Sequence, residues 1–385
     1  RAVILPILTA PLVLMGPVEL RGGVLIDAPV ERVSLRGVEV GGDEARVIGW
    51  DNVKRVIGDG EDDAAPFMEL AENAWRARIR VARGDFGMAS GLLEQLFLRL
   101  RDEQGPTALM VAEGTLASRL FFGDRVGAIE AWLAAVRLRA DGWRIAGDPP
   151  LEPIVDPDTL LMPGLAPVWL ERDELIGLVE GLDVSGAAEE PGADGEQRGG
   201  RSEVAARLRT LYAASARRAL GMEVDDGAVA AAADSSHDGV RLVGLMVEAQ
   251  SGDADTRAAA RQSLRAGLDD DLGTWREAWR RIALGKSLLL EPGEGERLDG
   301  MFELVHLPAR FSRSQSYLCG VALATMSDEV RARGDAASAS RLSDEMEGRY
   351  PRNTGIRWCG EREHAQRTGA VRPRNRCCST DPGSV

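Results

Sequence analysis

Glycine followed directly by aspartate interrupts a helical pattern of apolar residues at three points in this chain. On both sides of each interruption, apolar residues recur every three or four positions, which is the period of an amphipathic helix. The three dipeptides are Gly84-Asp85, Gly123-Asp124 and Gly334-Asp335. Glycine readily ends a helix in the left-handed conformation, and aspartate caps a following helix by accepting a backbone N–H. Each dipeptide therefore predicts a helical hairpin.

Two of these turns read Arg-Gly-Asp, at Arg83-Gly84-Asp85 and Arg333-Gly334-Asp335. Some extracellular proteins present this tripeptide to adhesion receptors. Here it recurs at the equivalent point of an equivalent hairpin, where an arginine also suits the negative end of the helix dipole. We therefore interpret it as a helix-end signal and not as an adhesion motif.

The hairpins resemble those of the tetratricopeptide family, in which a Gly-Asp turn is followed by a small residue and often by a proline after the second helix. The matching residues are Gly123, Asp124, Ala128, Ile129, Trp132 and Ala135 in one hairpin and Gly334, Asp335, Ala339 and Pro351 in another. The resemblance covers about a third of the chain. It implies an irregular array of helical hairpins whose first helices line an inner face that binds a protein or peptide partner.

Residues 18–58 show a different pattern, with short β-type runs separated by glycine-containing turns. They predict a small antiparallel β unit, whose strand count and size resemble those of a compact SH3-like barrel. The acidic stretch 58–66 is expected to be a linker. The predicted fold class is therefore mainly α, with an irregular tetratricopeptide-like helical-hairpin array preceded by a small antiparallel β unit.

The remaining organisation follows from composition and helix signals. Two helical hairpins are expected over 66–140, followed by a proline-rich extended segment over 141–182 that packs on the helices. Residues 183–203 are rich in glycine and charge, which is typical of a disordered linker. A second helical region with the third hairpin is expected over 204–358, including a helix capped by Thr274, and a frayed tail over 359–385.

Residues 1–17 begin with one arginine and an apolar run of the length of a secretory signal. This favours an exported or periplasmic protein in a bacterial cell envelope. The alternative is an apolar strand pair broken by Pro6 and Pro11 in a cytoplasmic protein. Membrane contact is expected only through this N-terminal segment.

The net charge of −14 argues against nucleic acid as a partner, because the long-range field repels polyphosphate. Gly285-Lys286-Ser287 matches the end of a phosphate-binding loop, but Arg280 stands where the first glycine is required, and the tripeptide falls in a predicted helix. The histidines and cysteines lack the spacing of metal sites. No catalytic, cofactor-binding or metal-binding residue is therefore predicted.

One polar cluster is a candidate site for an anion or carboxylate. It consists of His306, Arg310, Arg313 and Tyr317. Pro308 is expected to end one helix and Ser314 to cap the next, so that the cluster lies at a bend. The planar guanidinium group suits a carboxylate ligand, whereas the structural alternative is that these arginines pair with the acids of the chain itself.

The leading functional hypothesis is a non-enzymatic scaffold or protein-interaction module, based on the repeated hairpins. The alternative is an enzyme with dispersed carboxylate catalytic residues, which one sequence does not reveal. A pocket holding two convergent carboxylates with perturbed pKa values would favour the enzyme.

Overall fold

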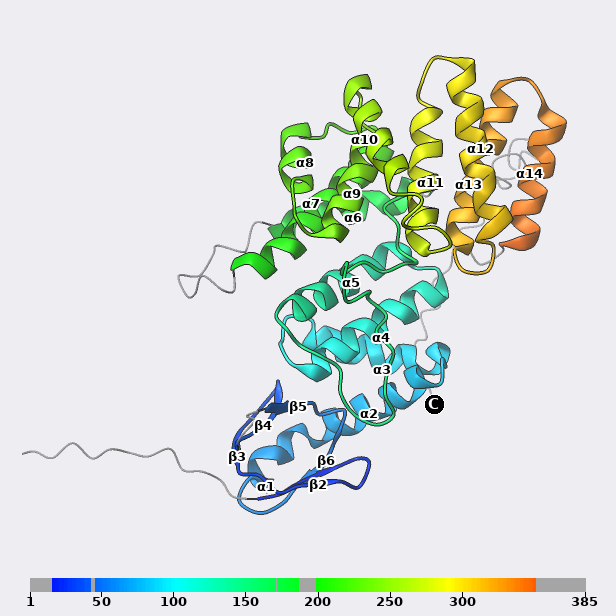
Figure 1. Cartoon of the computed structure of the whole chain (residues 1–385). Coiled ribbons are helices and arrows are strands. Elements are labelled where there is room, and N and C mark those ends of the chain that lie inside the picture. Colours follow the sequence, from blue (N-terminus) through cyan, green and yellow to red (C-terminus); the bar gives the residue numbers. More distant parts are fainter. Residues whose placement is uncertain (1–15, 43–45, 171, 187–198, 351–385) are drawn as a thin grey trace, which may run out of the picture.

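The computed structural model describes residues 16–42, 46–170, 172–186 and 199–350. It is mainly helical, with the small β unit and the last helices at opposite ends (Figure 1), which confirms the predicted fold class. Most of the expected targeting segment, the middle of the expected linker and the expected tail lie outside the described residues.

The β unit contains two three-stranded antiparallel sheets, with strand orders β2-β1-β6 and β3-β4-β5. The strands are β1 (Val18–Leu20), β2 (Leu25–Ile26), β3 (Val30–Ser34), β4 (Gly37–Val40), β5 (Arg46–Ile48) and β6 (Val53–Val56). The buried Trp50 joins this unit to the helices, because its indole N–H donates to the Ser34 carbonyl and its ring stacks on Phe67. Sequence reasoning missed β6, a short strand whose two end residues are buried and whose two middle residues are exposed, so that it lacks the two-residue alternation of a strand.

The expected linker at 58–66 is wrong in part. Three of its four acidic residues form the first turn of α1 (Glu61–Ala64), which leads through a short 3-10 helix (Ala65–Phe67) into α2 (Met68–Ala82). Three acidic side chains at a helix N-terminus are stabilised by the helix dipole, so this composition also suits a helix start.

All three predicted hairpins are present. They pair α2 with α3 (Phe86–Leu100), α4 (Pro106–Phe122) with α5 (Arg125–Ala140), and α13 (Ser316–Ala332) with α14 (Ala336–Arg349). At each turn the glycine has positive φ, +71° at Gly84, +83° at Gly123 and +89° at Gly334. The following aspartate accepts a backbone N–H at the start of the second helix.

The three turns also share one hydrogen-bond pattern. At the first turn, the N–H of Asp85 donates to the carbonyl of Arg80, and the N–H of Gly84 donates to that of Val81. The same pair of bonds forms around Gly123 and Gly334. This is the Schellman arrangement that satisfies the last carbonyls of a helix. The glycine and aspartate of the two Arg-Gly-Asp turns therefore have local structural roles.

The middle of the chain is helical over most of its described length. Its elements are α6 (Arg172–Gly186), α7 (Gly199–Leu220), α8 (Asp226–Ala233), α9 (Asp238–Glu248), α10 (Ala254–Ala266), α11 (Trp275–Leu288) and α12 (Glu294–Arg310). The predicted Thr274 cap of α11 is confirmed, since its hydroxyl accepts the Arg276 N–H.

Two boundaries differ from the expectations. Residues 183–186 and 199–203 belong to α6 and α7, so both ends of the expected disordered linker are helical. Pro308 lies inside α12, which ends only after Arg310, and α13 starts behind Gln315 without a side-chain cap from Ser314.

A segment without helices or strands, residues 146–169, runs between the two halves of the array, and we call it the strap. Residues 141–170 of the expected extended segment contain no helix or strand, whereas residues from Arg172 on are helical. Val155, Leu161 and Leu165 of the strap are fully buried. An irregular backbone in a core needs partners for its carbonyl groups.

Side chains from both halves of the molecule supply those partners. On the N-terminal side, the Trp132 indole donates to the Leu160 carbonyl and Arg125 donates to Gly164. The C-terminal donors are the Tyr212 hydroxyl to Leu165, the Ser215 hydroxyl to Pro167, the Trp279 indole to Pro163 and the Tyr317 hydroxyl to Val168. The strap thus joins the helical array across the middle of the chain.

Candidate functional site

The predicted anion site is distributed over separate contacts. Arg310, at the end of α12, forms an ion pair with the buried Glu277 of α11. Tyr317 donates its hydroxyl to the Val168 carbonyl at 3.0 Å, and the Arg125 guanidinium lies 3.4 Å from the centre of its ring. His306 is half-buried and Arg313 is exposed. The structure therefore gives Arg310 and Tyr317 partners within the protein.

Glu277 is the centre of the ion-pair network that engages Arg310. Its carboxylate also accepts from Arg281, 2.7 Å away, and from the Gly273 N–H, 2.7 Å away. Burial opposes ionisation of this carboxyl, but these hydrogen bonds and the nearby charges of Arg281 and Arg310 hold its pKa below the usual value. The network joins α11 to α12, which is a structural role.

The phosphate-loop-like tripeptide lies inside α11, as expected. A Cβ on Gly285 would lie 2.6 Å from Leu304 Cγ, so this glycine permits the close approach of α12. Lys286 is half-buried on the same helix, and burial lowers the pKa of its amine to about 8. The amides of this segment take part in the helix and cannot surround a phosphate.

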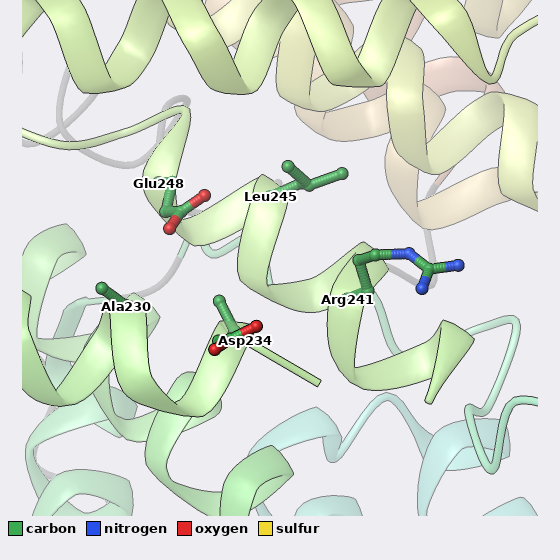
Figure 2. Close-up of a pocket in the computed structure, with 6 residues that line it drawn as sticks. Ala230, Asp234, Arg241, Leu245 and Glu248 are labelled. Atoms are coloured by element: carbon green, nitrogen blue, oxygen red, sulfur yellow. The ribbon is translucent and has the colours of Figure 1, made fainter. Parts of the chain in front are cut away.

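A pocket that sequence reasoning missed lies between α8 and α9. Its lining consists of Ala230, Ala233, Asp234, Arg241, Leu245 and Glu248, and its volume is about 200 Å³. Figure 2 shows Asp234 directly after the end of α8 and Glu248 on α9, with the Arg241 side chain extending away from both. The pocket combines an apolar wall of methyl groups with two acidic side chains.

The pKa of Glu248 is shifted in this pocket. Burial raises the pKa of its carboxyl, and the positive charge of Arg218 opposes that shift. Within the described residues, the carboxylates of Asp234 and Glu248 form no hydrogen bond or ion pair. Two unpaired carboxylates beside an apolar wall can bind a cation.

A second exposed feature lies on α12. Leu298, Phe302 and Val305 follow one another at spacings of four and three residues and are 41%, 67% and 49% exposed. We call these three residues the α12 ridge. Leu304 and Leu307, on the opposite side of the helix, are buried. The helix thus has an apolar face toward solvent in addition to its core face.

Several kinds of site find no support in the described part of the chain. No group of three His, Cys, Asp or Glu residues there could hold a metal ion. Nor is any helix among those residues long and apolar enough to cross a membrane.

Local sequence signals for the α8–α9 pocket and the α12 ridge were weak. The alanine run of α8 and the single acidic residues Asp234 and Glu248, 14 positions apart, match no site motif. The α12 ridge could have been recognised, because the helix has apolar residues on more than one face.

Comparisons with protein-family models, curated proteins and solved structures give no match to the chain.

Proposed function

We propose that this protein is a non-enzymatic scaffold that binds a partner protein through its helical array. The observation that carries the proposal is the α12 ridge. Three large apolar side chains on one exposed helix face form a contiguous surface, and such surfaces mark interaction sites more often than single exposed apolar residues do.

The geometry of the ridge suits an amphipathic helix as the occupant. Apolar residues spaced by three and four positions match the apolar stripe of a second helix packed alongside. Asp299, exposed beside Phe302 on the helix surface, and the net charge of −14 favour basic residues flanking that stripe. The proposed partner segment is therefore a basic amphipathic helix.

The burial of the first helices directs binding to such an outer face. Most of α4 and α13 is buried, and contacts with the strap cover them, through Glu113 of α4 and Tyr317 of α13. Little of either helix is left to line an open inner groove. The second helix of a hairpin, such as α12, offers more surface.

The test compares two exposed phenylalanines. The wild-type protein is immobilised and its partner is captured from an extract of cells that make the protein, identified and purified. Phe302→Ser should weaken the affinity for that partner about tenfold, because a central aromatic contact often dominates an interface. Phe122→Ser is the matched control, since Phe122 is 56% exposed at the end of α4. The affinity of this variant for the partner should differ from that of the wild type by less than about twofold.

Equal binding of the wild type and Phe302→Ser would contradict this proposal, provided that both variants keep the thermal stability of the wild type. The enzyme alternative has one observation in its favour, the raised pKa of Glu248 in the pocket. However, Asp234, the other acid of this pocket, is exposed, so the pocket lacks the two buried carboxylates that such an enzyme would need.

A further inference from the structure

Small residues give the pocket between α8 and α9 its shape. Gly244 of α9 packs against α8 so closely that a Cβ there would lie 2.4 Å from the Ala233 Cβ. Beside this crossing, Ala230, Ala233 and Leu245 form the apolar wall of a cavity of about 200 Å³. The cavity is wide enough for an extended side chain and too small for a folded element.

The charges around this cavity do not balance. Three arginines from the surrounding helices each have their own acidic partner, in the pairs Arg207–Glu203, Arg218–Asp226 and Arg241–Asp238. Asp234 and Glu248 have no ion-paired cation among the described residues; the positive charge of Arg218 acts on Glu248, but its ion pair is with Asp226. Glu248 is half-buried and Asp234 is exposed, and a carboxylate gains most from a cation that also supplies hydrogen bonds.

We propose that this pocket binds the side chain of an arginine or lysine from the partner protein. The aliphatic stem of that side chain packs against the alanine and leucine methyl groups, and its cation lies between Asp234 and Glu248. Arginine fits better than lysine, because its planar fork can donate to two carboxylates at once. This inference rests on the proposed scaffold function, since it identifies what the partner contributes.

The pocket and the α12 ridge favour the same kind of partner. Both surfaces are acidic or flanked by an acid, and both expose apolar groups. A basic amphipathic segment has the two complementary properties.

The direct test uses a capped tripeptide, N-acetyl-Gly-Arg-Gly-amide, and full-length protein with labelled alanine and leucine methyl groups. The peptide is expected to shift the methyl resonances of Ala230, Ala233 and Leu245 in a saturable manner. The same peptide with citrulline, which keeps the shape of arginine and loses its charge, should bind at least tenfold more weakly. Glu248→Gln should weaken binding of the arginine peptide about tenfold, whereas Glu223→Gln, an exposed acid outside the pocket, should change it less than twofold.

Three results would overturn the inference: unchanged pocket resonances, equal binding of the citrulline peptide, or full affinity in Glu248→Gln. The same variants separate it from the scaffold proposal. If the purified partner binds Asp234→Asn/Glu248→Gln as tightly as wild type but loses affinity for Phe302→Ser, the pocket inference fails and the scaffold proposal stands. If the arginine peptide binds the pocket but Phe302→Ser leaves partner affinity unchanged, the ridge proposal fails instead.

Discussion

Replacing Arg78 by methionine should destabilise the protein strongly, because this arginine connects three parts of the fold. Its side chain on α2 is fully buried, and its Nη1 lies 2.6 Å from the carboxylate of Asp51 at the edge of the β unit. The same guanidinium donates to the carbonyl groups of Ala146 and Pro149 in the strap.

The magnitude follows from what the substitution leaves behind. Asp51 is 1% exposed, and removing one partner of a buried ion pair costs about 3–5 kcal/mol. The strap carbonyls lose a donor, at about 1–3 kcal/mol for each buried group that stays unsatisfied. Since these costs do not add fully, we expect a loss of about 4 kcal/mol or more, which is a large part of a typical stability.

Urea-induced unfolding of the wild type, Arg78→Met, Asp51→Asn and the double variant measures this loss as a double-mutant cycle. Asp51→Asn removes the charge and keeps the shape, so the double variant should be about 2 kcal/mol more stable than the sum of the single effects predicts. The reasoning would be refuted if Arg78→Met cost less than about 1 kcal/mol, or if the two effects added within about 0.5 kcal/mol.

Two further predictions concern the turns. Gly84→Val should cost about 1–2 kcal/mol in unfolding free energy, because Gly84 has φ of +71°, where a side chain is strained even though the space around it is open. The control Gly91→Val, inside α3 and equally open, should cost nothing. Equal thermal unfolding midpoints of the two variants would count against the left-handed turn. Hydrogen bonds from the Ser338 side chain and N–H hold the pKa of Asp335 below its usual value, so its stabilising effect is complete above the pKa of the unfolded state and is lost as the pH falls through the folded-state pKa. The difference in Tm between the wild type and Asp335→Ala should therefore shrink as the pH falls below about 4, and a constant difference would contradict the cap.

The hairpin turns could be predicted because their chemistry is local. Glycine conformation, the aspartate cap and the apolar period all lie within one stretch of sequence, as at Gly123-Asp124. Gly252-Asp253 is a further, weaker Gly-Asp turn of the sequence. There Asp253 caps α10 through the Thr256 N–H, but Gly252 is not in the left-handed region. Whether the glycine adopts the left-handed conformation thus depends on more than the Gly-Asp dipeptide itself.

The strap contacts and the pocket could not be predicted, because their residues meet only in the folded chain. Trp279 and Pro163 are 116 positions apart, and Tyr317 and Val168 are 149 positions apart. The prolines of the strap indicate an extended backbone, but they do not indicate which side chains satisfy its carbonyls. Pro308 shows that a local signal can also mislead. The proline predicts a helix end, whereas α12 tolerates it within its last turn.

The strap also explains why the binding surfaces lie where we propose them. In an open array of hairpins, the first helices would line a concave face. Here the strap packs against α4, α5, α7, α11 and α13. The last four helices supply side-chain donors, such as Trp132, Tyr212 and Trp279, and α4 supplies the acceptor Glu113. A partner would have to displace the fully buried Leu161 and Leu165 to reach that face, at about 1.5–3 kcal/mol for each side chain. The α12 ridge and the α8–α9 pocket require no such displacement, so a partner can contact either one without disturbing the core.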